Sequence, residues 1–138
     1  EIGTSFDLII AEINDGPDAA DDSVSATEDQ VQIIPIVDLL SNDFDVENNA
    51  FELTSISAVS GGSAVLDGAG NIVFTPDADF FGEASFTYEV TDIFGGTGQA
   101  TVTVNVAAVN DAPVLAGVLL DQSSDEDTLV EFTLPSGL

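Results

Sequence analysis

Apolar and polar residues alternate along much of the chain, and this pattern predicts β-strands with one buried face. The clearest segments are residues 86–91 and 101–106, where every second side chain is aliphatic or aromatic. Both are expected to be antiparallel strands whose inward faces form a core. We expect that core to contain Phe86, Tyr88, Val90, Val102, Val104 and Val106, with Phe80 and Phe81 beside them.

Other apolar runs lie between turn signals rich in Gly, Asn and Asp, and they predict further strands. Pro35 interrupts one of these runs, which predicts an edge strand or a strand that switches sheets. No segment has a helical period. Short strands at regular spacing are typical of a sandwich or barrel. The additional strands are expected at residues 6–13, 31–37, 51–59, 63–66, 71–75 and 128–134.

The charge of the chain excludes several classes of function. It has 26 acidic residues, no Lys, Arg, His or Cys, and a formal net charge of −26. The chain therefore has no basic surface that could bind nucleic acids or anionic membranes. A disulfide, a thiol nucleophile and the usual zinc ligands are also excluded. Hydrophobic residues make up 44% of the chain, so it is able to bury a core, and the acidic surface needs cations from solvent.

An internal repeat divides the chain into domains. Ile13-Asn14-Asp15-Gly16-Pro17 recurs 96 residues later as Val109-Asn110-Asp111-Ala112-Pro113. Glu28-Asp29 recurs 98 residues later as Glu126-Asp127. A period just under a hundred residues fits one sandwich domain. We therefore expect the last strand of a preceding repeat in residues 1–16, a complete domain in 17–111, and the start of a following repeat in 112–138.

The segment 85–113 carries a resemblance to a known family. Ser-Phe-Thr-Tyr-Glu-Val-Thr-Asp, a Gly-rich turn, a Thr/Val strand and Val-Asn-Asp-Ala-Pro together resemble the cadherin-like repeats of giant bacterial surface proteins and adhesins. Residues 74–82 resemble the family's Phe-x-Pro-x-x-x-Phe-x-Gly pattern with one extra apolar residue. Residues 114–138 resemble the opening of a dystroglycan-type cadherin-like domain. The resemblance implies an all-β, Greek-key immunoglobulin/cadherin-like β-sandwich of about seven strands, with Ca²⁺ at the junctions between repeats.

The same resemblance implies two groups of calcium ligands, because calcium prefers many oxygen ligands in a flexible arrangement. The junction before the complete domain draws on Asn14, Asp15, Asp43, Asp45 and Asp92. The junction after it draws on Glu28, Asn110 and Asp111, with Asp77 or Asp79 in the family's mid-domain acidic position. The next Asp-x-Asp pair is expected after Leu138, so the second group is incomplete in this chain.

Other interpretations of these acids remain open. Asn-Asp-x-Pro is also ordinary turn chemistry, and 43–45 alone resembles a solvated loop. Oxygen ligands also bind magnesium, although flexible sites with several carboxylates favour calcium. The remaining acids are interpreted as solubilising surface charge: Asp18, Asp21, Asp22, Asp121 and Asp125.

The leading functional hypothesis is a calcium-rigidified extender repeat of an extracellular adhesin or filament on the bacterial cell surface. Its partners are then adjacent repeats or identical subunits. The alternative is a filament subunit that exchanges its terminal strands with its neighbours. Catalysis by paired carboxylates and binding of carbohydrate or ice have no supporting motif, so we expect no enzyme, no nucleic-acid partner and no membrane insertion.

Overall fold

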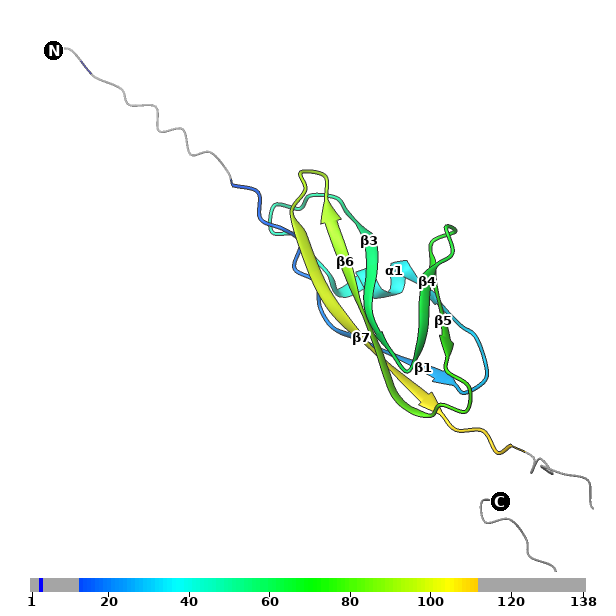
Figure 1. The fold of residues 1–138 in the computed structure, drawn as a ribbon. Coiled ribbons are helices and arrows are strands. Elements are labelled where there is room, and N and C mark those ends of the chain that lie inside the picture. Colours follow the sequence, from blue (N-terminus) through cyan, green and yellow to red (C-terminus); the bar gives the residue numbers. More distant parts are fainter. Residues whose placement is uncertain (1–2, 4–12, 112–138) are drawn as a thin grey trace, which may run out of the picture.

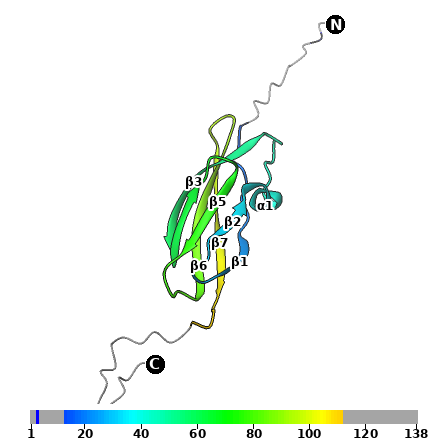
Figure 2. The ribbon, with the colours of Figure 1, turned by 90° about the vertical axis from the view of Figure 1, so that its right-hand side faces the viewer.

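The computed structural model describes Gly3 and residues 13–111. These residues form an elongated sandwich of seven strands in two sheets, as predicted (Figure 1). The view at right angles shows the two layers and the short helix beside them (Figure 2). The strand expected at 128–134 and most of the one expected at 6–13 lie outside the described residues.

The larger sheet has four strands in the order β1-β7-β6-β3. Strands β3, β6 and β7 pair antiparallel, as the alternation in residues 86–91 and 101–106 predicts for β6 and β7. Strand β1 instead pairs parallel to β7, from Asp22 beside Val102 to Thr27 beside Ala107. This strand was not predicted, because its sequence DSVSAT holds few apolar residues. The strands are β1 (Asp22–Thr27), β7 (Thr97–Ala107), β6 (Gly82–Asp92) and β3 (Phe51–Ser60).

The smaller sheet has three antiparallel strands in the order β2-β5-β4. They are β2 (Gln32–Pro35), β5 (Asn71–Pro76) and β4 (Gly62–Leu66). Pro35 lies in an edge strand, as predicted, where its missing N–H disrupts no ladder. The expected strand at 31–37 ends at Pro35, because the chain turns there into helix α1 (Ile36–Leu39) and a 3₁₀ turn (Leu40–Asn42). Leu39 of this helix is buried, a tertiary contact that no periodicity indicated.

The core lies between the sheets and contains the alternating residues of β6 and β7. All six predicted core residues of these strands are at most 5% exposed. Phe74 stacks on Phe86 with ring centroids 6.3 Å apart. Phe80 packs against the core, but the placement of Phe81 in the core is wrong, since its side chain is 64% exposed. Two adjacent residues entering a strand point to opposite sides, so only one of them can face the core.

The two ends of the sandwich are where the described chain begins and ends (Figure 1). We call the end with residues 13–16, 44–50 and 92–96 the N-terminal pole. The opposite end, with residues 28–31, 77–82 and 107–111, is the C-terminal pole. No helix in the described part of the chain is long and apolar enough to cross a membrane.

Candidate metal centres at the two poles

Asn14 connects the incoming chain to the end of β6 at the N-terminal pole. Its side-chain amide donates to Asp92 Oδ2 at 2.8 Å, and its Oδ1 accepts from the Asn49 amide at 2.9 Å. Asp92 Oδ1 accepts the backbone N–H groups of Phe94 and Gly96, at 2.7 and 2.9 Å. The hydrogen bond from Asn14, reinforced by these N–H groups, lowers the pKa of Asp92. Asp92 therefore remains an ionised acceptor at neutral pH.

Asp45 presents a buried carboxylate oxygen at the same pole. Its Oδ1 accepts the backbone N–H groups of Glu47 and Asn49, both at 2.9 Å. The residue is only 8% exposed, and its Oδ2 is buried and accepts no hydrogen bond from the described residues. Buried polar atoms almost always have a partner, and a buried carboxylate oxygen without one is costly. A cation bound here would provide a partner for this oxygen.

Glu47 and Asn49 extend this oxygen-rich pole. Glu47 Oε2 accepts the backbone N–H of Asp15 at 3.2 Å, and the Asp15 side chain is exposed. A hollow of about 340 Å³ is lined by Asn14, Glu47, Asn49 and Phe94. The carboxylate and amide oxygens around it are hard ligands of the kind that calcium binds. The chemistry of the donors fits that ion.

Asp43 makes different contacts from Asp45, although the sequence pairs the two. Its Oδ1 accepts the backbone N–H of Ala20 at 2.8 Å, and its Oδ2 accepts the Tyr88 hydroxyl at 3.0 Å. The same hydroxyl lies 3.2 Å from Asp22 Oδ2. Burial, partly offset by the Tyr88 hydrogen bond, raises the pKa of Asp22. Interpreting Asp22 as a plain solubilising charge therefore misses its contact with the core.

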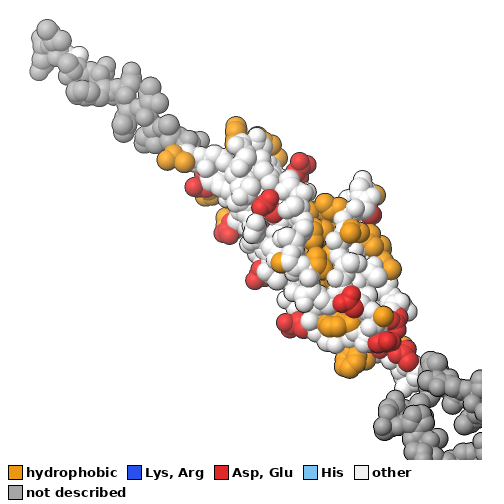
Figure 3. Space-filling view, in the orientation of Figure 1, with side chains coloured by type: hydrophobic (Ala, Val, Ile, Leu, Met, Phe, Trp, Pro, Cys, Tyr) orange, Lys and Arg blue, Asp and Glu red, His pale blue; other side chains and the backbone are white. Residues whose placement is uncertain are grey.

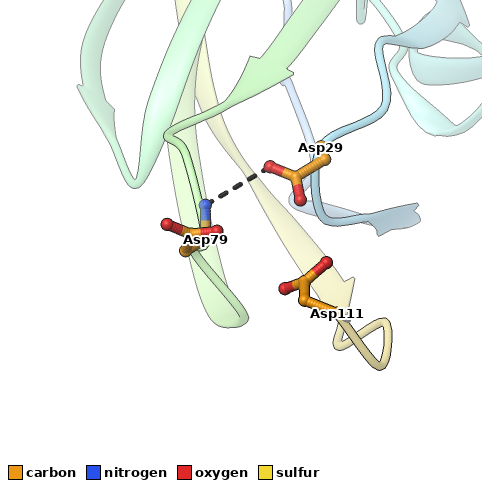
Figure 4. A group of neighbouring side chains, drawn as sticks. All are labelled: Asp29, Asp79 and Asp111. Carbon is orange, nitrogen blue, oxygen red and sulfur yellow. Dashed lines mark hydrogen bonds between the residues drawn. The ribbon is translucent and has the colours of Figure 1, made fainter. Parts of the chain in front are cut away.

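The C-terminal pole carries a group of three exposed aspartates: Asp29, Asp79 and Asp111 (Figure 4). A carboxylate oxygen from each lies within 4.8 Å of the others, and Asp29 Oδ1 accepts the backbone N–H of Asp79 at 3.3 Å. Three carboxylates this close repel one another, and a divalent cation between them removes that repulsion. Asp29, Asp79 and Asp111 are the three described carboxylates that lie close enough together to share one ion.

Glu28 lies beside this group but has a structural contact of its own. The side chain is 3% exposed, and its Oε1 accepts the backbone N–H of Val109. Asn110 and Asp77 are exposed at the same pole, and neither belongs to the three-carboxylate group. The acidic side chains of this end are visible as a red group where the described chain leaves the domain (Figure 3).

Sequence reasoning did not single out Asp29 at one pole, and it treated Glu47 and Asn49 at the other only as part of a turn able to supply one further carbonyl oxygen. The resemblance led to Glu28, whereas the exposed carboxylate at the pole is that of the next residue. Asp29 has a positive φ of 59°, and Asp79 has one of 57°. Asp and Asn adopt this conformation more readily than most residues, so an acid in a tight turn was the signal available.

Comparison with known proteins gives one family. Residues 14–105 match the family described as Bacterial Ig domain. The match spans all seven strands except the last residues of β7. No curated protein matches the chain.

Proposed function

The chain belongs to the bacterial Ig domain family, and we propose that it is a calcium-rigidified extender repeat of a bacterial surface protein. Domains of this family are typical of surface proteins and are usually structural modules without catalysis. The family match does not test the cadherin-like resemblance, from which the proposal takes tandem repeats, an extracellular location and calcium at each junction. Adjacent repeats are then the partners of this domain.

The observation that carries the proposal is the unpartnered Oδ2 of Asp45. It lies at the pole where the chain arrives, in the loop that also bears Glu47 and Asn49. The three-aspartate group lies at the opposite pole, where the chain departs (Figure 1). In a tandem array, each junction lies between the C-terminal pole of one repeat and the N-terminal pole of the next. An ion at the junction therefore needs oxygen ligands at both poles of the domain, and the presence of such groups at both poles supports an extender. Calcium acts here by neutralising carboxylates and adding its binding energy to folding.

The strand-exchange filament remains the alternative proposal. Its exchanging segments are residues 1–16 and 112–138, of which the structure describes Gly3 and residues 13–16. Within residues 13–111 all seven strands come from the chain itself. We therefore develop the extender.

A thermal melt of the full chain tests the proposal in excess Ca²⁺, excess Mg²⁺ and chelator. Calcium at 100 times its dissociation constant is expected to add about 2.7 kcal/mol to the unfolding free energy. Magnesium is expected to add less, since it requires rigid octahedral geometry. Equal midpoints in all three conditions would refute the proposal.

Matched variants assign the response to a pole. Asp45→Asn is expected to abolish the response of the N-terminal pole, and Asp79→Asn that of the C-terminal pole. The control is Asp38→Asn, an exposed acid on helix α1 in the middle of the molecule (Figure 1). It removes the same charge and is expected to leave the calcium response intact. An equal loss in all three variants would indicate diffuse charge screening instead of sites.

A further inference from the structure

The sequence repeat allows the two poles to be compared as two sides of one junction. Ile13-Asn14-Asp15 aligns with Val109-Asn110-Asp111 at an offset of 96 residues. In a tandem array, residue 109 of one repeat is followed by the residue that corresponds to Asn14 of the next. The contacts of Val109 therefore describe the upstream side of a junction, and those of Asn14 describe its downstream side.

On the upstream side, the chain is held to its own domain up to residue 109. The backbone N–H of Val109 donates to the buried carboxylate of Glu28. The backbone N–H of Glu28 in turn donates to the carbonyl of Ala107 at 3.0 Å. A hydrogen bond to a buried, charged acceptor is among the stronger ones in a protein. The end of β7 is thus fixed two residues beyond the strand.

On the downstream side, the chain is held from residue 14. The Asn14 side chain bridges Asp92 and Asn49, and the next N–H, that of Asp15, donates to Glu47. All three acceptors or donors belong to the domain that follows the linker.

We infer that successive repeats are fastened head to tail by two adjacent residues, with no free linker residue between them, before any metal ion binds. The inference rests on the proposed tandem array. Adjacent Cα atoms lie about 3.8 Å apart, so the C-terminal pole of one repeat must abut the N-terminal pole of the next. The partner that fits each pole is the opposite pole of a neighbouring repeat.

The surfaces of the poles fit such a contact. Eight of the thirteen large apolar side chains that the described residues leave exposed lie at the poles. Five are at the N-terminal pole (Ile13, Phe44, Val46, Ile93 and Phe94) and three are at the C-terminal pole (Val31, Phe81 and Val109). Because Ile13 and Val109 occupy the same position of the repeat, a junction brings Phe44, Val46, Ile93 and Phe94 of one repeat toward Val31 and Phe81 of the other.

The metal-free junction is testable in a chain whose repeat, residues 14–109, is duplicated in register within the full sequence. The protein has no cysteine, so Ser63→Cys in each copy gives one spin label per repeat on the exposed side of β4. Pulsed electron paramagnetic resonance then measures the distance distribution between the labels. In chelator we expect one narrow distribution, against the broad one of freely moving domains that is the default for tandem modules.

The central junction supplies the decisive variant. Asn14→Ala in the second copy removes the bridge between repeats and is expected to broaden the distribution several-fold. The same substitution in the first copy is the control. It removes the same hydrogen bonds within one domain, and so destabilises that domain equally, but it leaves the central junction intact. An unchanged width in the central variant would overturn the role assigned to Asn14.

Calcium separates this inference from the proposed function. A distribution that is broad in chelator and narrow in calcium would overturn metal-free fastening and leave the calcium-rigidified extender standing. One that is narrow in both, with no calcium shift of the melting midpoint, would support the fastening and overturn the metal sites. A broad distribution in both conditions would overturn the inference.

Discussion

The hydroxyl of Tyr88 donates to the carboxylate of Asp43, with 3.0 Å between Oη and Oδ2. The tyrosine ring is fully buried at the centre of β6. Asp43 also accepts the N–H of Ala20, so this contact ties the middle of the larger sheet to the loop after the 3₁₀ turn and to the segment before β1. The acid that the sequence presents as half of a ligand pair thus has a structural role as well.

Tyr88→Phe is expected to destabilise the fold, because the ring is kept and only the hydroxyl is lost. A hydrogen bond to a charged acceptor contributes about 1.5–3 kcal/mol, and we expect a loss in that range in urea denaturation. The control is Thr54→Val, which removes an exposed hydroxyl that bonds only Thr91 and Glu89 in β6. A loss no larger than that of the control would contradict the role of the Tyr88–Asp43 contact.

Asp22→Asn is expected to stabilise the protein at pH 7. Burial, with Asp43 and Asp21 nearby, raises the pKa of Asp22 in the folded state, so its ionised form opposes folding at neutral pH. The gain is expected to stay below about 1 kcal/mol, because solvent screens a partly exposed group. It must fade as the pH falls through the raised pKa toward the ordinary value. Melts of both proteins from pH 7 to pH 3 in chelator measure this, and a gain independent of pH would contradict the assigned cause.

Asp92→Asn is expected to have the opposite sign. The hydrogen bond from Asn14 and the turn N–H groups lower the pKa of Asp92, so its carboxylate stabilises the fold above the ordinary aspartate pKa. The variant should melt earlier than the parent at pH 7 in chelator. The difference should shrink as the pH falls through the lowered pKa, where the parent loses the same stabilisation. A difference that grows in acid would refute this account.

Gly98→Ala tests how closely the incoming chain lies on β7. A Cβ at residue 98 would lie 2.0 Å from the carbonyl oxygen of Pro17, which is backbone and unable to move aside cheaply. We expect a loss of about 1–3 kcal/mol, as for other overpacked sites. The matched control is Gly3→Ala, whose Cβ meets nothing within 4 Å. Equal stability of the two variants in urea denaturation would show that the segment before β1 is not held against β7.

The strands were predicted correctly from the sequence where apolar and polar residues alternate strictly. Strands β6 and β7 and their six core residues follow from period two alone, because each side of a strand meets a different environment. Strand β1 escaped detection because its stability comes from parallel pairing with β7, a partner about 80 residues away. Helix α1 escaped because four residues are too few to show a period, and the burial of Leu39 holds it.

The candidate sites divide in the same way. The family resemblance implied Asn14, Asp45 and Asp92 at one pole and Asp111 at the other, and the repeated Asn-Asp linker supported Asn14 and Asp111. It did not distinguish Asp43 from Asp45, or Asp29 from Glu28. Those distinctions depend on which side chain faces a buried tyrosine, a backbone N–H or open solvent.

An acidic, all-β domain without basic, thiol or imidazole side chains follows from residue types and from the period of the apolar pattern, both of which are properties of the linear sequence. Which carboxylates lie together depends on chain folding, because Asp29 and Asp79 come from two separate turns and Asp111 from the segment after β7, and the fold brings all three to one pole. The same is true of Asp45, whose bare Oδ2 exists only because the surrounding loop buries it.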